Sequence, residues 1–194
     1  MEFQHELIIP DEGFPFKVFL FEGGNGNYVR EKHWHTSIEI FAVLAGSLDF
    51  FVNKEEYPLK AGEQIIINSN EIHSIHAPEK NQTVVLQIPL KQFENYFTAQ
   101  RFIRFRGQEE TTDKKLTSLI KKLYKTYVDR ETGYEFKTMS IFYEIMYILI
   151  RDYRVTEAKE KEIRHSRRLD VLSKITTYMR EHYKEDLKLS ELAA

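Results

Sequence analysis

Short β-forming runs dominate the first 88 residues and restrict the folds that this chain can adopt. Runs rich in Val, Ile, Phe and Tyr recur at short intervals: FKVFLFE, SIEIFAVLAG, LDFFVN, EQIIIN and TVVLQI. Turns containing Gly or Asn separate them, as at residues 23–27, 45–47 and 60–62. Many short strands joined by such turns are typical of an antiparallel sandwich or barrel, because parallel strands need long crossover connections.

Pro89 marks a change in the apolar pattern, whose period shifts from 2 towards 3.6. Residues 112–130 and 135–153 each carry an apolar stripe with helical spacing, and Gly133 lies between them as a helix breaker. The pattern predicts an antiparallel helix pair with an apolar seam. The seam residues are Leu116, Ile120, Leu123 and Tyr127 on the first helix, and Met139, Phe142, Met146 and Leu149 on the second.

The second predicted helix is apolar on more than one face, since it also carries Ile141, Ile145 and Ile148. A helix of this kind must bury more than one face. One explanation places one face on the partner helix and another on the β-rich body. The other adds a symmetric contact with a second copy, and on this basis we expect a homodimer that uses the eight seam residues.

The end of the chain carries features of a second, smaller unit. Residues 155–168 are highly charged and predict a linker, whose basic run RHSRR either contacts phosphates or is simply solvated. An amphipathic helix follows over residues 169–183. Ser190 then has the character of a helix N-cap, so we expect the protein to continue beyond Ala194. The predicted division is 1–90 for the β-rich domain, 91–156 for the helical region, 157–169 for the linker and 170–194 for the start of another domain.

Composition limits the cellular location and the binding partners that we expect for this protein. The absence of cysteine excludes disulfides and thiolate metal sites, and favours the reducing cytoplasm. The N-terminal segment lacks the regions of a signal peptide, and no apolar run approaches the roughly 18 residues of a membrane span. Residues 1–100 carry 7 Lys and Arg against 14 Asp and Glu, whereas the remainder carries 21 against 16. A polyanion is therefore a candidate partner for the second half, with an ordinary solvated surface as the alternative.

The segment HWHTSIE contains the residues with the clearest chemistry. His33, His35 and Glu39 are separated by even numbers, so on one strand they would point to the same side of the sheet. Two imidazoles and a carboxylate on one face form a natural site for a divalent metal, and His73 offers a further imidazole. Phe41 shares the parity of Glu39 and is a candidate pocket wall. The opposite parity of Trp34 and His76 predicts packing for the former and surface exposure for the latter.

Three interpretations of these polar residues remain open on the residues alone. They hold a divalent metal, they line a metal-free pocket that hydrogen-bonds a polar effector, or they are satisfied polar groups of the interior. No cofactor is required by the second and third interpretations. No arrangement of nucleophile and base is found, and we expect that the chain is not an enzyme.

Two segments resemble the paired motifs of the cupin superfamily. The first, H-x-H-x3-E-x6-G, is matched by His33, His35, Glu39 and Gly46, and the second is matched at Gly62 and His73. Asn68, Asn70 and Ala77 stand where that superfamily has Pro, Gly and Asn, which counts against a catalytic cupin. The amino-acid sequences of both segments, with NSNEIHS in the second, resemble more closely the N-terminal sensing domain of AraC-type transcription regulators. The end, RRLDVLSKITTYMREHYKEDLKLSELAA, resembles the opening of their helix-turn-helix domain.

The resemblance implies a β-rich α+β chain: a cupin-like antiparallel β-barrel of the jelly-roll type, followed by a helical hairpin and a further C-terminal helix. It implies a pocket for a small-molecule effector, with sugars as the familiar class, lined by His33, His35, Glu39, Phe41 and His73. DNA would be bound only by the full-length protein, because the recognition helices are missing from this sequence. The alternative is a metal-dependent cupin enzyme, a dioxygenase or isomerase, that uses His33, His35, Glu39 and His73.

Overall fold

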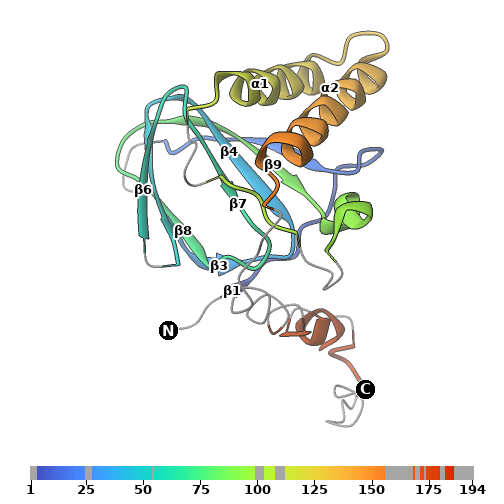
Figure 1. Cartoon of the computed structure of the whole chain (residues 1–194). Coiled ribbons are helices and arrows are strands. Elements are labelled where there is room, and N and C mark those ends of the chain that lie inside the picture. The colour runs from blue at the N-terminus through green and yellow to red at the C-terminus, as the bar shows by residue number, and fades with distance from the viewer. Residues whose placement is uncertain are drawn as a thin grey trace.

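Two facing β-sheets form the body of the molecule (Figure 1). The computed structural model describes residues 4–24, 28–53, 55–98, 103–107, 112–155, 168, 171–172, 174–179 and 182–185. Within these residues, one sheet has the strand order β1-β3-β8-β5-β6 and the other β2-β9-β4-β7. The strands are β1 (Gln4–His5), β2 (Lys17–Phe21), β3 (Tyr28–Trp34), β4 (Ile38–Ala45), β5 (Ser47–Val52), β6 (Glu55–Lys60), β7 (Gln64–Ile67), β8 (His73–Ala77) and β9 (Gln82–Ile88).

The strand sequences explain which faces are buried. In β5, alternate residues point inward, and the outer face is only partly covered. In β4 and β9, nearly every residue is buried, which agrees with their almost continuous apolar sequences. An apolar core lies between the two sheets and contains Phe41, Phe50 and Ile67. A second core lies on the other face of the β2-β9-β4-β7 sheet, where the helices cover it.

The helices follow a short 3-10 helix, η1 (Leu90–Tyr96). They are α1 (Lys114–Asp129), α2 (Tyr134–Ile148) and the π-helical turn η2 (Leu149–Tyr153) that continues α2. Asp113 caps α1 by accepting from the backbone N–H groups of Lys115 and Leu116. The turn between the helices needs left-handed backbone, with φ of 79° at Gly133, a conformation that glycine adopts without steric cost.

The predicted seam between the helices packs within one chain. Its residues belong to the second core, together with residues of β2, β4 and β9. The buried members are Leu116, Ile120, Leu123, Phe142 and Leu149, each at 0% exposure, and the partly buried ones are Tyr127, Met139 and Met146. The buried side chains therefore offer no contact to a second copy. The reason is that the helix pair covers the apolar outer face of a sheet. The seam and the additional Ile stripe of α2 are buried in this contact.

The predicted jelly-roll body followed by a helical hairpin is confirmed, although the two sheets form a sandwich and not a closed barrel. Near the C-terminus, residues 171–172 and 174–179 are helical. The predicted linker with its basic run and the LSELAA segment lie outside the described residues, apart from Arg168. No helix among the described residues combines the length and apolarity that crossing a membrane requires.

Candidate functional site

The four predicted ligand residues converge between the sheets, at a corner where the chain passes from one sheet to the other. His33 lies near the end of β3, and Glu39 lies in β4 of the opposite sheet. The expectation that they share one strand is wrong. Six residues of straight strand would separate them by roughly 20 Å, whereas the turn after Trp34 folds them face to face. His73 joins them as the direct cross-strand partner of His33.

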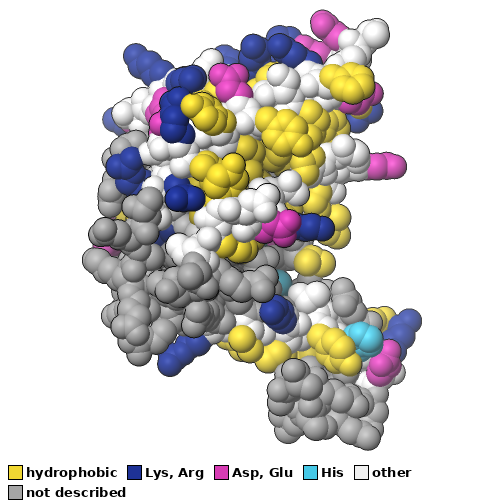
Figure 2. All heavy atoms as spheres, turned by 45° about the vertical axis from the view of Figure 1, so that its right-hand side comes forward, with side chains coloured by type: hydrophobic (Ala, Val, Ile, Leu, Met, Phe, Trp, Pro, Cys, Tyr) yellow, Lys and Arg dark blue, Asp and Glu magenta, His cyan; other side chains and the backbone are white. Residues whose placement is uncertain are grey.

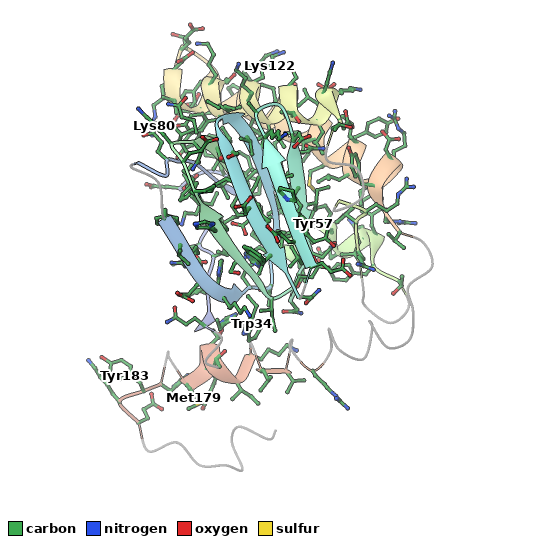
Figure 3. All side chains as sticks on the ribbon, turned by 90° about the vertical axis from the view of Figure 1, so that its left-hand side faces the viewer. Trp34, Tyr57, Lys80, Lys122, Met179 and Tyr183 are labelled. Carbon is green, nitrogen blue, oxygen red and sulfur yellow. The ribbon has the colours of Figure 1, made fainter. Side chains whose placement is uncertain are left out.

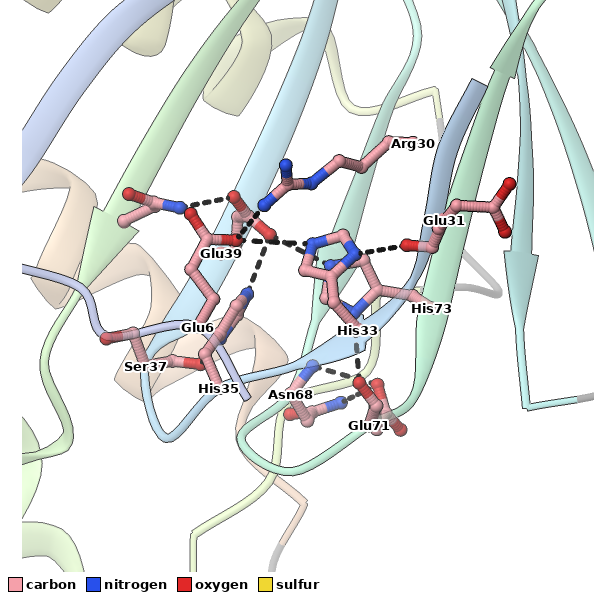
Figure 4. A network of polar contacts seen from close by, with 11 residues as sticks. Glu6, Arg30, Glu31, His33, His35, Ser37, Glu39, Asn68, Glu71 and His73 are labelled. Carbon is pink, nitrogen blue, oxygen red and sulfur yellow. Dashed lines mark hydrogen bonds and ion pairs between the residues drawn. The ribbon is translucent and has the colours of Figure 1, made fainter. Parts of the chain in front are cut away.

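We call His33, His35, Glu39 and His73 the His/Glu cluster (Figure 4). One ligand atom from each residue lies within 4.8 Å of all the others. Nε2 of His35 is 2.8 Å from Oε2 of Glu39, and Nε2 of His73 is 3.2 Å from the same oxygen. No member is more than 4% exposed. A molecule larger than an ion can therefore reach the cluster only if neighbouring groups move aside.

The backbone fixes the orientation of all three imidazoles. Nδ1 of His33 faces the carbonyl oxygen of Glu31 at 2.8 Å, and Nδ1 of His73 faces that of Glu71 at 2.9 Å. Nδ1 of His35 faces the carbonyl oxygen of Ser37 at 3.1 Å. A carbonyl only accepts, so each Nδ1 carries the proton. In the neutral form of each ring, the Nε2 lone pair is then directed at the cluster, as in histidines that bind metals.

Gln87 holds the carboxylate of the cluster from the other side. It is the cross-strand neighbour of Glu39 in β9, and its Nε2 donates a 2.7 Å hydrogen bond to Oε1 of Glu39. Oε2 is thereby left to face the histidines. Gln87 is not among the residues predicted from the sequence, although a signal is present: it is the single amide in the apolar run TVVLQI.

Electrostatics within the cluster favour one charge pair. Burial works against charge on His35, yet the attraction of Glu39 and the hydrogen bond to it raise the pKa of His35 above its ordinary value. Burial also disfavours the Glu39 carboxylate, but His35 and His73 hold the pKa of Glu39 well below its ordinary value. Burial and the neighbouring His73 lower the pKa of His33 to about 4. Near neutral pH, His33 therefore offers an uncharged Nε2 as a ligand atom.

The loop before His73 is fixed by a buried amide. Asn68 donates from Nδ2 to the carbonyl oxygen of Phe105 at 3.1 Å and accepts from the Phe105 N–H at 2.8 Å. Glu71 accepts from the Asn68 N–H at 2.8 Å, and its own carbonyl faces His73. Burial raises the pKa of Glu71 above its ordinary value. These contacts fix His73 through the loop that carries the NSNEIHS sequence.

The other residues singled out from the sequence lie in the core or at the surface. Phe41 is buried and packs its ring on Phe50, with centroids 4.5 Å apart. Trp34 packs on His5 of β1, and it marks the end of the sandwich opposite Lys122 of α1 (Figure 3). The side chain of His76 is 38% exposed and lies beside Asp49, which agrees with the predicted surface position.

The donor set fits a divalent transition metal. Ligand atoms placed about 2 Å from a central ion lie roughly 3–4 Å from one another. The four atoms of the cluster lie within 4.8 Å of one another, so a small contraction would bring them around an ion. Nε2 of His73 is buried and lacks hydrogen-bond geometry towards any described residue. Three imidazoles with one carboxylate suit zinc, iron, manganese or nickel. The cluster can therefore bind a cation directly, or hydrogen-bond a polar molecule admitted to the corner.

Comparisons with known proteins find one matching family and several similar solved structures. The AraC-like ligand binding domain family matches residues 15–146. A conserved protein of unknown function from Streptococcus pyogenes has a similar structure, with 16% identity over 39% of this chain and 66% of its own, and a TM-score of 0.37. A cupin superfamily protein from Desulfitobacterium hafniense shares 12% identity over 39% of this chain and 68% of its own, with a TM-score of 0.37.

A third similar structure is the oxalate decarboxylase of Bacillus subtilis, whose Mn(II) centres have been studied. It shares 21% identity over 39% of this chain and 21% of its own, with a TM-score of 0.36. Among curated proteins, none matches this sequence.

Proposed function

The chain belongs to the AraC-like ligand binding domain family, and from that premise we propose that it is the effector-sensing region of a DNA-binding transcription regulator. The His/Glu cluster is the centre of its binding site. One observation carries this assignment: three imidazoles, each oriented by a backbone carbonyl, and one carboxylate converge at a buried corner between the sheets. Nε2 of His73 is buried there without hydrogen-bond geometry towards any described residue, and a bound ligand would supply the partner that such a group needs.

Effector binding would act by favouring one of two arrangements of the full-length protein. This requires that the effector bind one arrangement more tightly than the other. The loop before His73 is a physical route for such a preference. It is hydrogen-bonded through Asn68 to Phe105, and the N–H of neighbouring Arg106 donates to the carbonyl oxygen of Tyr153 at the end of η2.

A thermal-shift screen of sugars and other small polar metabolites tests the sensor. Compounds that raise the Tm of the wild type are then tested on a His33→Ala/His73→Ala double variant. We expect the shift to disappear, because two of the groups that contact the effector are gone. A half-buried surface pair, His76→Ala/His182→Ala, serves as the matched control. If compounds stabilise the double variant as much as the wild type, the effector does not bind at the cluster.

The second candidate is a metal-dependent cupin enzyme, and the orientation of the three Nε2 atoms favours it. His33, His35, His73 and Glu39 would hold the ion, which would supply Lewis-acid or redox chemistry. Elemental analysis of protein purified without chelator decides whether a metal is resident. One ion per chain that is lost in the His33→Ala/His73→Ala variant, together with turnover of a small substrate, would favour the enzyme over the sensor.

Dimerisation uses the outer face of α2 in this proposal. Phe136, Tyr143 and Tyr147 are 83%, 61% and 58% exposed. At 100° per residue they fall within about 40° of the helix circumference. Figure 2 shows hydrophobic side chains gathered over the helical part of this face. Aromatic groups presented together on one surface are typical of protein interfaces.

A further inference from the structure

A carboxylate from the N-terminal segment stands beside the His/Glu cluster. Oε2 of Glu6 lies 3.0 Å from the guanidinium of Arg30 and 3.5 Å from Nε2 of His33 (Figure 4). The position is set by the backbone: β1 pairs with β3, and the N–H of Glu6 donates to the carbonyl oxygen of Trp34 at 2.9 Å. Strand pairing thus places Glu6 beside the cluster, although the two are far apart in the sequence.

Glu6 and Arg30 form the border between the buried cluster and solvent. Their side chains are 28% and 43% exposed, whereas that of His33 is only 5% exposed. A ligand that approaches His33 from this side meets the ion pair first. The guanidinium of Arg30 is permanently charged, and its planar fork matches a carboxylate.

The contacts that hold the Glu6 side chain are weak. Among the described residues, Arg30 is its one side-chain hydrogen-bond partner. Nε2 of neutral His33, 3.5 Å away, carries no proton that it could donate. An ion pair with this exposure contributes only about 0–1 kcal/mol. Strand β1 is two residues long. Exchange of the Glu6 carboxylate for another carboxylate therefore costs little.

We propose that the Glu6 carboxylate occupies the position of a ligand carboxylate, so that the effector is a small carboxylic acid that pairs with Arg30 and reaches His33. This inference rests on the proposed function, since it names the chemical class of the effector. A neutral sugar that displaced Glu6 would leave Arg30 without its counter-ion. An acid replaces one carboxylate by another and keeps the charge balance of the corner.

Acetate is the probe, because it reproduces the head group of Glu6. In Glu6→Ala, acetate is expected to bind saturably with a millimolar Kd and to shift the NMR signals of the His33 ring and the Arg30 Nε–H. The wild type should bind acetate at least tenfold more weakly, because Glu6 competes. Glu6→Gln keeps the shape without the charge, and is expected to bind acetate more tightly than the wild type does.

Three controls make the result specific. Acetamide, the neutral analogue, should cause no shift in Glu6→Ala. Arg30→Gln added to Glu6→Ala should abolish acetate binding. Glu56→Ala removes an exposed carboxylate from β6 and should bind acetate as the wild type does. Equal acetate affinity in wild type and Glu6→Ala, or binding that survives Arg30→Gln, would overturn the proposal.

The outcome is separable from that of the proposed function. Suppose that acetate binding follows this pattern, but the screen compounds raise the Tm of the His33→Ala/His73→Ala variant as much as that of the wild type. This result would support the carboxylate position and reject the cluster as the effector site. Suppose instead that only neutral compounds raise the Tm, that their effect requires the cluster, and that Glu6→Ala does not bind acetate. This result would support the sensor function and reject a carboxylic acid as the effector.

Discussion

At the scale of single residues, the carboxylate of Glu39 depends on neighbours at both of its oxygens. His35 and His73 face Oε2, and Gln87 donates to Oε1. All of these groups are buried, so no water replaces a lost contact. A buried acceptor that loses its donor costs the full desolvation of that group, and an ionised acceptor costs more than a neutral one.

Gln87→Met should therefore destabilise the protein although it keeps the volume of the side chain. We expect the free energy of unfolding to fall by about 1–3 kcal/mol, measured as a lower urea midpoint at unchanged m-value. The matched control is Gln82→Met in the same strand, where the glutamine is exposed and bonds Glu22 at the surface. A Gln87→Met midpoint equal to that of the control would show that Oε1 is stabilised by other means.

The sequence predicts the four cluster residues, but not how they meet. Even spacing is informative only along one strand, and here the chain turns a corner after Trp34 and places Glu39 in the opposite sheet. Glu6 and Gln87 are not predicted because they reach the cluster through strand pairing, at separations of 27 and 48 residues from His33 and Glu39. Such pairing depends on the register of the sheets, which no local pattern encodes.

At the scale of elements, the start of α1 and the end of η2 are joined by a buried tyrosine. The hydroxyl of Tyr153 donates to Oδ2 of Asp113 at 2.7 Å and accepts from Nε2 of Gln64 at 3.3 Å. This links the two ends of the helical region to strand β7. The helix pair is thereby fixed to the sheet by polar contacts as well as by its apolar face.

Tyr153→Phe removes the hydroxyl and leaves the ring packed. We expect a loss of about 1–3 kcal/mol in the free energy of unfolding, since the buried amide of Gln64 loses its acceptor. Tyr147→Phe is the control, because its hydroxyl meets Arg151 at the surface, and it should change stability by less than about 0.5 kcal/mol. Thermal or urea unfolding measures the stability of both variants. Similar losses of unfolding free energy in the two would show that the buried hydroxyl has no special role.

Asp113 makes the stability of the same junction dependent on pH. Burial would raise the pKa of Asp113, but the Tyr153 hydroxyl and the N–H groups of Leu116 and Lys115 hold it below its ordinary value. A carboxyl with a lowered folded-state pKa adds stability that is present above the unfolded pKa and lost as pH falls through the folded value. Between about pH 5 and pH 3, wild-type stability should therefore fall more steeply than that of Asp113→Asn, measured by urea unfolding. Parallel curves would contradict this.

The helices themselves are predicted well, because a 3.6-residue period over four turns is a strong local signal. What they pack against is not predicted. The seam pattern of Leu116, Ile120 and Leu123 is the same whether a helix covers another helix, a sheet or a second copy. The apolar outer face of β4 and β9 decides among these, since it must be covered within the same chain.

At the scale of the whole molecule, the His/Glu cluster and the exposed aromatic face of α2 belong to different parts. The His/Glu cluster lies between the sheets, and the helices cover the outer face of one sheet (Figure 1). The apolar groups of the seam are consumed in that contact. A second copy must therefore use side chains that the chain leaves exposed, and Phe136, Tyr143 and Tyr147 are the largest of these on α2.

Phe136→Ser/Tyr143→Ser should convert a dimer into a monomer. Sedimentation velocity at tens of micromolar compares the wild type, this variant and Ile9→Ser, which removes another exposed apolar group, 66% exposed, outside the helical region. We expect the wild type and Ile9→Ser to sediment as dimers and the α2 variant as a monomer with unchanged circular dichroism. The folded monomer should persist because neither substituted side chain contributes to the buried core. A monomeric wild type, or a dimeric α2 variant, would remove this face from the assembly and leave the aromatic side chains without that role.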